Sequence, residues 1–262
     1  MSYTIPIGPY HPALEEPIHA RLTVDGERIT DAEVFVGYNH RGIERLAQER
    51  NFIQTLVLVE RVCGICSHSH SLTYALCIEH IAGMEVPKRG QYIRVIIEEL
   101  ERIHSHLLWL GIACHIVGHD SLFMQCWNDR EGTMDVLEAL TGNRVNYGMN
   151  IIGGARRDFT DDQRRDLMAA MDDLEQRMGP ITHWLTHDKT LAMRTKCVGI
   201  LTREDAIRLG AVGPHARASG VDMDVRRDAP YSSYEDFDFK VPVQESGDVY
   251  ARVVIRVLEI YE

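Results

Sequence analysis

The sequence predicts an α+β fold that is mainly helical: a bundle of long helices with a small N-terminal antiparallel β region. Residues 1–38 contain Gly8-Pro9 and two short runs of strand-type residues. From residue 40 onward, apolar residues recur at intervals of three and four, which is typical of amphipathic helices. We therefore expect an N-terminal β region over residues 1–39 and a helical bundle domain over residues 40–262.

The β region is expected to contain a hairpin. Residues 19–24 and 33–38 have strand character, and Asp25-Gly26-Glu27 between them favours a tight turn. Glu16 stands in the loop before the first of these strands, where a solvated carboxylate is the simplest interpretation.

The clearest helix is predicted over residues 88–118. Its apolar residues repeat at three and four, and at about 1.5 Å per residue it spans on the order of 45 Å. That length suits the spine of a bundle. A helical pattern also runs from residue 43 to residue 83, through the cysteine motif described below.

Polar residues mark the starts of the later helices. The segment Thr160–Gln163 is a capping box for a helix that is expected to stop at Gly179-Pro180. The segment Thr202–Asp205 begins a short helix in the same way. Residues 248–262 have a helical pattern that reaches the last residue without an end signal.

Composition excludes several classes of protein. With 28 Lys plus Arg against 39 Asp plus Glu, the formal net charge is −11, which argues against a nucleic-acid partner and provides no polybasic membrane anchor. The N-terminus shows no secretory signal, and the longest apolar stretch, residues 107–118, is too short to cross a bilayer. The six cysteines of such a cytosolic-type chain are expected to be thiols or metal ligands.

The most informative segment is Arg61-Val-Cys63-Gly-Ile-Cys66-Ser-His-Ser-His70. If it is helical, offsets of three and four bring Cys63, Cys66 and His70 onto one face. Two thiols and an imidazole suit a soft or borderline transition metal. The alternatives are two small cysteines buried in a helix, a zinc site or a redox dithiol.

Other reactive side chains are expected to be structural. The isolated cysteines and the histidines of the long helix are interpreted as core residues, and its acidic segment as a solvated face. A Gly-Gly-Ala-Arg-Arg segment is suited to approaching an anionic group. The residues concerned are Cys77, Cys114, Cys126, Cys197, His104, His106, Glu98, Glu99, Glu101, Arg102 and residues 153–157.

These residues together resemble a known signature. Arg41-Gly42-Ile43-Glu44, sixteen residues, and then Arg61-x-Cys63-Gly-x-Cys66-x-x-x-His70 resemble the N-terminal signature of nickel–iron hydrogenase large subunits, spacer length included. Residues 8–17 resemble the opening of the energy-converting, membrane-bound (group 4) hydrogenases. Residues 101–111, 146–156 and 213–231 are similar both to these enzymes and to the related 49 kDa (D) subunit of respiratory complex I.

The resemblance implies a site and a cofactor. In that family, two C-x-x-C pairs hold a nickel–iron centre whose iron carries CO and cyanide. By position, Cys63 would bind nickel and Cys66 would bridge nickel and iron. His70 would form a hydrogen bond near the bridging sulfur, and Glu16 would pass protons from the terminal thiolate. Glu44 matches a residue associated with a second site for magnesium or iron.

The resemblance also implies a catalytic subunit that reversibly reduces protons to H2. Electrons would come from a ferredoxin-type donor through an iron–sulfur small subunit with a 4Fe–4S cluster. A membrane arm and other hydrogenase subunits would couple the reaction to ion translocation. The subunit would be cytoplasmic and peripheral, on the inner face of the cell membrane.

The chain departs from the family pattern at one point. Its 262 residues contain no second C-x-x-C pair, so we expect either an N-terminal portion of a longer subunit or a natural short variant with half a site. The last helix has no end signal, which favours the first. Two alternatives stay open: a complex I-like redox or coupling subunit with an incomplete metal site, and a zinc-binding module using Cys63, Cys66 and His70. The cysteine pair argues against the first, because complex I members lack it. The sixteen-residue spacer and Arg41–Glu44 have no role in the second, the zinc-binding module.

Overall fold

The computed structural model describes residues 2–12, 14 and 16–262 and divides into two compact units, Met1–Asn51 (unit 1) and Phe52–Glu262 (unit 2). Each unit is described by itself. The predicted fold class, α+β and mainly α, is confirmed. Within the described residues, none of the helices is both long and apolar enough to cross a membrane.

Unit 1 is an antiparallel sheet followed by a short helix. The strands pair in the order β1-β2-β3, and Gly26 takes a left-handed conformation (φ 63°) in the predicted turn. The hairpin is therefore confirmed, although its second strand begins at Arg28 and not at residue 33. The elements are β1 (Ser2–Ile7), β2 (His19–Asp25), β3 (Arg28–Phe35) and α1 (Ile43–Gln48).

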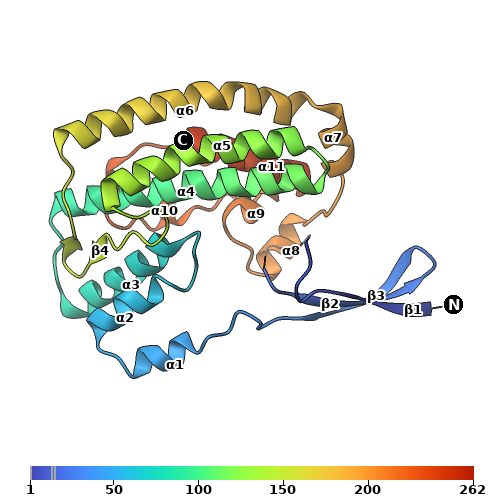
Figure 1. Ribbon diagram of the computed structural model, residues 1–262, viewed down its shortest axis with the longest axis horizontal. Coiled ribbons are helices and arrows are strands. Elements are labelled where there is room, and N and C mark those ends of the chain that lie inside the picture. The colour runs from blue at the N-terminus through green and yellow to red at the C-terminus, as the bar shows by residue number, and fades with distance from the viewer. Residues whose placement is uncertain (1, 13, 15) are drawn as a thin grey trace. The chain divides into compact units, whose positions relative to one another are not determined.

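Unit 2 is the helical bundle. Its antiparallel helices α4 and α5 lie side by side, α6 packs along α5, and α11 packs against α4 (Figure 1). The elements are α2 (Phe52–Val59), α3 (Ser67–Ala82), α4 (Lys88–Ile116), α5 (Asp120–Thr141), β4 (Asn150–Ile151), β5 (Gly154–Ala155), α6 (Asp161–His187), α7 (Lys189–Thr195), α8 (Arg203–Arg208), α9 (Gly213–Ala218), α10 (Val225–Asp228), the 3-10 helix η1 (Tyr234–Asp236) and α11 (Val249–Tyr261).

The long helix predicted over residues 88–118 is confirmed as α4, and its apolar face carries the core. One cluster joins its C-terminal half, including Leu107 and Leu110, to α5, α6 and α11. A second cluster joins its N-terminal half, including Ile97, to α5 and to the loop that contains Tyr147 and Met149. Both halves of one straight helix are thus buried, which makes α4 the spine of unit 2.

The predicted end of α6 at Gly179-Pro180 is wrong. The capping box at Thr160 is present, but the helix continues through Pro180 to His187. A proline inside a helix costs about 3 kcal/mol, because it removes a backbone donor and crowds the preceding turn. Met178 and Ile181, on either side of Pro180, are buried in the same core cluster, and this packing keeps the two halves in line.

The helix starts at Thr202 and Asp248 agree with the sequence. The Thr202 side chain accepts a hydrogen bond from the Asp205 backbone, and the Asp248 side chain accepts one from Ala251 at the start of α11. Asp248 also accepts a bond from the Cys197 backbone at 2.9 Å, so the cap ties α11 to an earlier loop.

The crossing of α4 and α5 depends on a glycine, which gives a direct test. A Cβ at Gly111 would stand 2.9 Å from Cδ1 of Trp127. We expect Gly111→Val to lower the free energy of unfolding by about 1–3 kcal/mol through overpacking. Gly132 on α5 is the matched control: a Cβ there meets nothing within 4 Å. Gly132→Ala should raise the same free energy by about 0.5–1 kcal/mol.

Urea denaturation of both variants measures these changes. Equal destabilisation by the two substitutions would show that the α4–α5 contact at Gly111 is not tightly packed.

Candidate functional site

Cys63 and Cys66 lie at the junction between α2 and α3. Cys63 stands in a non-helical turn and Cys66 immediately precedes α3, so the helical face predicted for the motif is wrong for both cysteines. The two thiols still meet, within hydrogen-bonding reach of each other. The Ile65 backbone N–H donates to Cys63 Sγ at 3.3 Å. A turn, and not a helix, brings the pair together.

Both thiols are half-buried. Burial raises the pKa of Cys66 to about 12, and Cys63, Glu101 and Glu98 add to the effect. A bound cation would reverse this preference, because thiolates are the metal-binding form. The pair thus combines two adjacent, half-buried sulfurs with acidic neighbours, Glu98 and Glu101.

A carboxylate from α4 holds the first turn of α3 in place. Glu101 is 2% exposed, and its Oε1 accepts the His68 backbone N–H at 2.7 Å and lies 3.3 Å from the Ser67 hydroxyl oxygen. Its Oε2 accepts the Ser69 backbone N–H at 3.0 Å and the Ser69 hydroxyl at 2.9 Å. Cys66 makes no side-chain cap of its own, so Glu101 satisfies the free donors that follow it.

The interpretation of residues 98–102 as a solvated helix face is therefore wrong. Glu98 and Glu101 are buried, and Glu99 and Arg102 are partly buried. Glu101 faces the cysteine loop, whereas Glu99 faces the C-terminal part of unit 2. The acidic segment of α4 is an internal polar layer.

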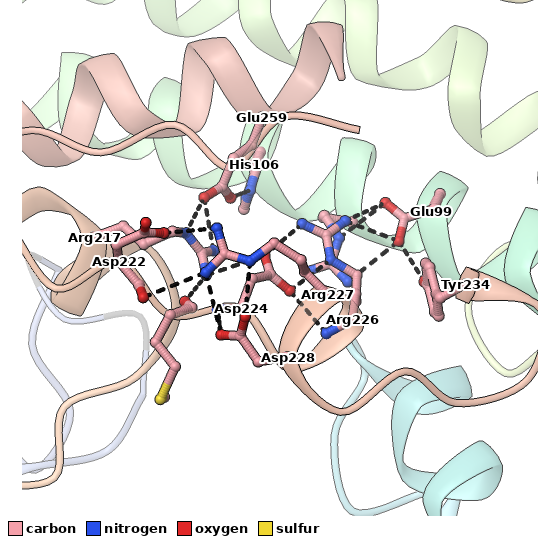
Figure 2. A network of polar contacts seen from close by, with 12 residues as sticks. Glu99, His106, Arg217, Asp222, Asp224, Arg226, Arg227, Asp228, Tyr234 and Glu259 are labelled. Atoms are coloured by element: carbon pink, nitrogen blue, oxygen red, sulfur yellow. Dashed lines mark hydrogen bonds and ion pairs between the residues drawn. The ribbon is translucent and has the colours of Figure 1, made fainter. Parts of the chain in front are cut away.

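The layer continues on the far side of α4 as a network of charges (Figure 2). Glu99 pairs with Arg102 at 3.0 Å and with Arg226 of α10 at 3.1 Å, and it accepts the Tyr234 hydroxyl. Arg226 in turn binds Asp224 at 2.8 Å. These bonds attach α10 and η1 to α4.

The other half of this network reaches α11. Glu259 accepts His106 Nε2 at 2.7 Å and pairs with Arg217 of α9 at 2.6 Å. Arg217 also lies 3.2 Å from Asp224, which closes the network to Arg226 (Figure 2). A buried ion pair of this kind is favourable only when each charge is fully paired, and here each is.

The loop over residues 145–150 is fixed to the start of α3. The buried Glu60 accepts the Gly148 backbone N–H at 2.5 Å, and the Ser67 hydroxyl donates to the Val145 carbonyl. His68 is completely buried. Its Nε2 donates to the Arg94 carbonyl at 3.0 Å, which leaves Nδ1 to accept from Asn150 at 3.2 Å.

The segment over residues 153–157 does approach an anion, and the anion is internal. The Gly153 backbone N–H donates to Glu79 at 2.7 Å, and Glu79 forms a buried pair with Arg94 at 2.6 Å. Arg156 does not take part in this contact; it donates to the carbonyls of Thr141 and Tyr147. The segment closes the core and is not an open anion site.

The predicted core positions divide into two groups. His104 and His106 are buried and hydrogen-bonded, as expected, and Cys114 and Cys126 are buried. The same prediction is wrong for Cys77 and Cys197, which are exposed. Cys77 lies on the outer side of α3, and Cys197 follows α7 in a turn with φ 59°.

Two predicted site residues belong to unit 1. Glu16 is exposed in that unit and accepts a hydrogen bond from the Asn39 side chain. Glu44 is exposed in the first turn of α1. Glu15, the other member of the acidic pair, lies outside the described residues. The roles of Glu16 and Glu44 toward the thiols stay predictions.

Among residues 2–12, 14 and 16–262, no three His, Cys, Asp or Glu side chains form a group that could hold a metal ion. The structure brings Cys63 and Cys66 together, and half-buried His70 on the first turn of α3 does not complete a ligand triad with them. The two adjacent thiols alone would supply two ligands to a metal ion.

The chain matches two family profiles. The family described as "Nickel-dependent hydrogenase" matches residues 41–112, which contain both cysteines. The family described as "Respiratory-chain NADH dehydrogenase, 49 Kd subunit" matches residues 117–262, more than half of the chain.

Three similar proteins agree with these profiles. The membrane-bound hydrogenase subunit alpha of Pyrococcus furiosus is 45% identical over 98% of this chain, and the chain spans 62% of that relative's length. The carbon monoxide-induced hydrogenase of Rhodospirillum rubrum is 43% identical, covering 97% of this chain and 71% of that protein. A chain in the structure of the membrane-bound sulfane sulfur reductase (MBS), an archaeal respiratory membrane complex, superimposes with a TM-score of 0.94 at 31% identity, covering 99% of this chain and 71% of that one.

The buried histidine His104 predicts a pH dependence of stability. Burial lowers its pKa from 6.5 to about 3, so the unfolded chain binds one more proton between these values. Burying neutral His104 therefore carries no penalty above about pH 6.5. The free energy of unfolding decreases as the pH falls from 6.5 toward 3. In His104→Gln, the slope of the unfolding free energy over that range should be smaller by up to about 1.4 kcal/mol per pH unit.

Urea unfolding at stepped pH values gives the slope. His115→Gln, an exposed position on the same helix, is the control and should keep the wild-type slope. An unchanged slope in His104→Gln would mean that His104 is protonated in the folded state.

Proposed function

The chain belongs to the family of membrane-bound hydrogenase large subunits and respiratory NADH dehydrogenase 49 kDa (D) subunits, and we propose that it acts as the catalytic subunit of an energy-converting nickel–iron hydrogenase. The reaction is the reversible reduction of protons to H2. The observation that carries the proposal is the meeting of the Cys63 and Cys66 thiols in a half-buried turn beside two buried carboxyl groups.

Cys63 and Cys66 would hold the nickel–iron centre, with CO and cyanide on its iron. When bound, such a centre supplies Lewis-acidic metals that polarise H2. The chain's own residues prepare the site: Ile65 N–H donates to the Cys63 sulfur, and Glu101 accepts the backbone N–H of His68, two residues after Cys66. Two further thiolates would come from residues outside these 262.

Three other residues have proposed roles. Glu16 would move protons to and from the thiol site, because a carboxylate in a loop can both bind and release them. His70 would support the bridging Cys66 sulfur from the first turn of α3. Glu44 would belong to a second site for magnesium or iron.

The proposed setting is a multisubunit complex on the inner face of the cell membrane. The relatives named above include a membrane-bound hydrogenase subunit and a respiratory membrane complex. An iron–sulfur small subunit with a 4Fe–4S cluster would carry electrons from a ferredoxin-type donor. A membrane arm with other hydrogenase subunits would couple the reaction to ion translocation.

A second candidate is a redox subunit of a complex I-like assembly that carries no nickel–iron centre. One observation favours it: the 49 kDa subunit profile matches more than half of the chain. The close structural match to a sulfane sulfur reductase supports the same alternative.

An infrared spectrum of the complex purified from its native host separates the two candidates. We expect sharp bands of metal-bound CO and cyanide, with nickel in the same sample. In Cys66→Ser the bands and the nickel should both be lost, because an alcohol is a poor ligand for these metals at neutral pH. Cys77→Ser, an exposed cysteine on α3, is the control and should keep both.

Absence of the bands and of nickel from the wild-type complex would reject the hydrogenase proposal in favour of the second candidate. Full nickel content in Cys66→Ser would reject the ligand assignment alone.

The proton role of Glu16 has a separate test. Glu16→Gln should slow H2/D2O isotope exchange by about 10²-fold while the infrared bands stay, because the amide cannot accept and release protons. Glu27→Gln, in the β2–β3 turn of the same unit, is the control. Wild-type exchange in Glu16→Gln would remove Glu16 from the proton path.

A further inference from the structure

A single hydroxyl group connects the two buried carboxyl groups of α4. Ser69 Oγ lies 2.8 Å from Glu98 Oε1 and 2.9 Å from Glu101 Oε2. A serine hydroxyl has one hydrogen and can donate it to only one of these oxygens. The second short oxygen–oxygen contact is a full hydrogen bond when a carboxyl group supplies another hydrogen. The geometry therefore favours one proton on the Glu98–Glu101 pair.

The surroundings of the two groups indicate where this proton resides. Both Glu101 oxygens accept backbone N–H groups, from His68 at 2.7 Å and from Ser69 at 3.0 Å, and these bonds favour the ionised form. Glu98 is 6% exposed, and within the described chain its Oε2 is buried without any hydrogen-bond partner. An ionised carboxylate in that position would be poorly solvated, whereas a neutral acid needs fewer partners.

We propose that Glu98, Ser69 and Glu101 form a one-proton relay next to the cysteine turn, with Glu98 as the resting proton holder. In the forward step, the O–H bond of Glu98 breaks as one forms on the Ser69 oxygen. The original Ser69 O–H bond breaks as one forms on Glu101 Oε2. One proton moves from Glu98 to Glu101, and Ser69 ends as it began.

The charges that face Glu98 are consistent with this assignment. On α4 these are Glu99, Glu101 and Arg102, and from other elements Arg226, Tyr231 and the Cys66 thiol. The two guanidinium groups are already paired with Glu99, at 3.0 and 3.1 Å. They are therefore less available to keep Glu98 ionised.

The pKa values of the two groups point the same way. Burial raises the pKa of Glu98, despite the opposing effect of Arg102. Burial and the neighbouring Glu98 raise the pKa of Glu101 to about 7. Two coupled carboxyl groups of this kind titrate as a pair, and both pKa values are raised.

The relay lies where a proton would be useful to the thiols. Glu101 binds the two backbone N–H groups of Ser69 and His68, close behind Cys66, and both carboxyl groups act electrostatically on the Cys66 thiol. Its use in turnover rests on the proposed hydrogenase function. The presence of a proton on Glu98 does not depend on the hydrogenase function. Either proposal can therefore be disproved without the other.

Infrared difference spectroscopy on the purified complex detects the proton directly. At pH 7, we expect the C=O stretching band of a neutral carboxylic acid, with a shift in D2O, in the wild type. Glu98→Gln should lose this band. Glu175→Gln, an exposed position on α6, should keep it. Identical spectra for wild type and Glu98→Gln in this region would overturn the proposal, whether or not the complex makes H2.

Two substitutions of Ser69 test the hydroxyl group that connects the two carboxyl groups. They also test the proposal if Glu98→Gln does not fold. Ser69→Ala removes the hydroxyl, so the acid band should move in frequency and H2/D2O exchange should slow by about 10²-fold. Ser69→Thr restores the hydroxyl and should restore both. A band unmoved by Ser69→Ala would show that the hydroxyl does not contact the acid, which contradicts the relay.

Discussion

The position of the thiols depends on one set of hydrogen bonds, those between Glu101 and the first turn of α3. The N-terminus of a helix leaves backbone donors without partners and carries partial positive charge. In α3 these donors come directly after Cys66, and a carboxylate on the bundle's central helix accepts them. Because α4 is packed along both halves, it transmits the rigidity of the core to the cysteine turn.

The same helix holds the C-terminal part of unit 2 through its opposite side. Glu99 and His106 lie about two turns apart on α4 and anchor the network of Arg226, Arg217 and Glu259. Removing one partner from such a network leaves a buried charge unpaired, at a cost of about 3–5 kcal/mol. An arrangement in which every charged residue of the network has a partner is therefore strongly preferred over one that leaves a charge unpaired. This preference selects a single packing of α9, α10 and α11 on α4.

The sequence was sufficient for features that depend on local chemistry. Apolar periodicity located α4 and α11, and the capping residues Thr160 and Thr202 located helix starts. The meeting of Cys63 and Cys66 followed from their spacing even though the segment is a turn. These signals act within a few residues of the structure that they specify.

The polar layer of α4 could not be predicted in the same way. Glu98 and Glu101 stand three residues apart, which also describes a solvated face, and only the elements packed on them distinguish the two cases. The signal that was available is their position among apolar residues on a helix long enough to be covered. The predicted end of α6 at Pro180 was wrong for the same reason, because tertiary packing outweighed the local preference against proline inside a helix.

The thiols and carboxyl groups together create a charge-balance constraint on the site. Two thiolates and two carboxylates in one half-buried region would repel one another strongly if all were ionised. Protons on Cys66 and Glu98 relieve this repulsion in the metal-free chain. A cation bound by the thiolates would relieve it instead and would release protons, since metal binding and deprotonation are linked. The protons held by the carboxyl layer and the charge at the thiols are thus linked through electrostatics alone, without movement of the backbone.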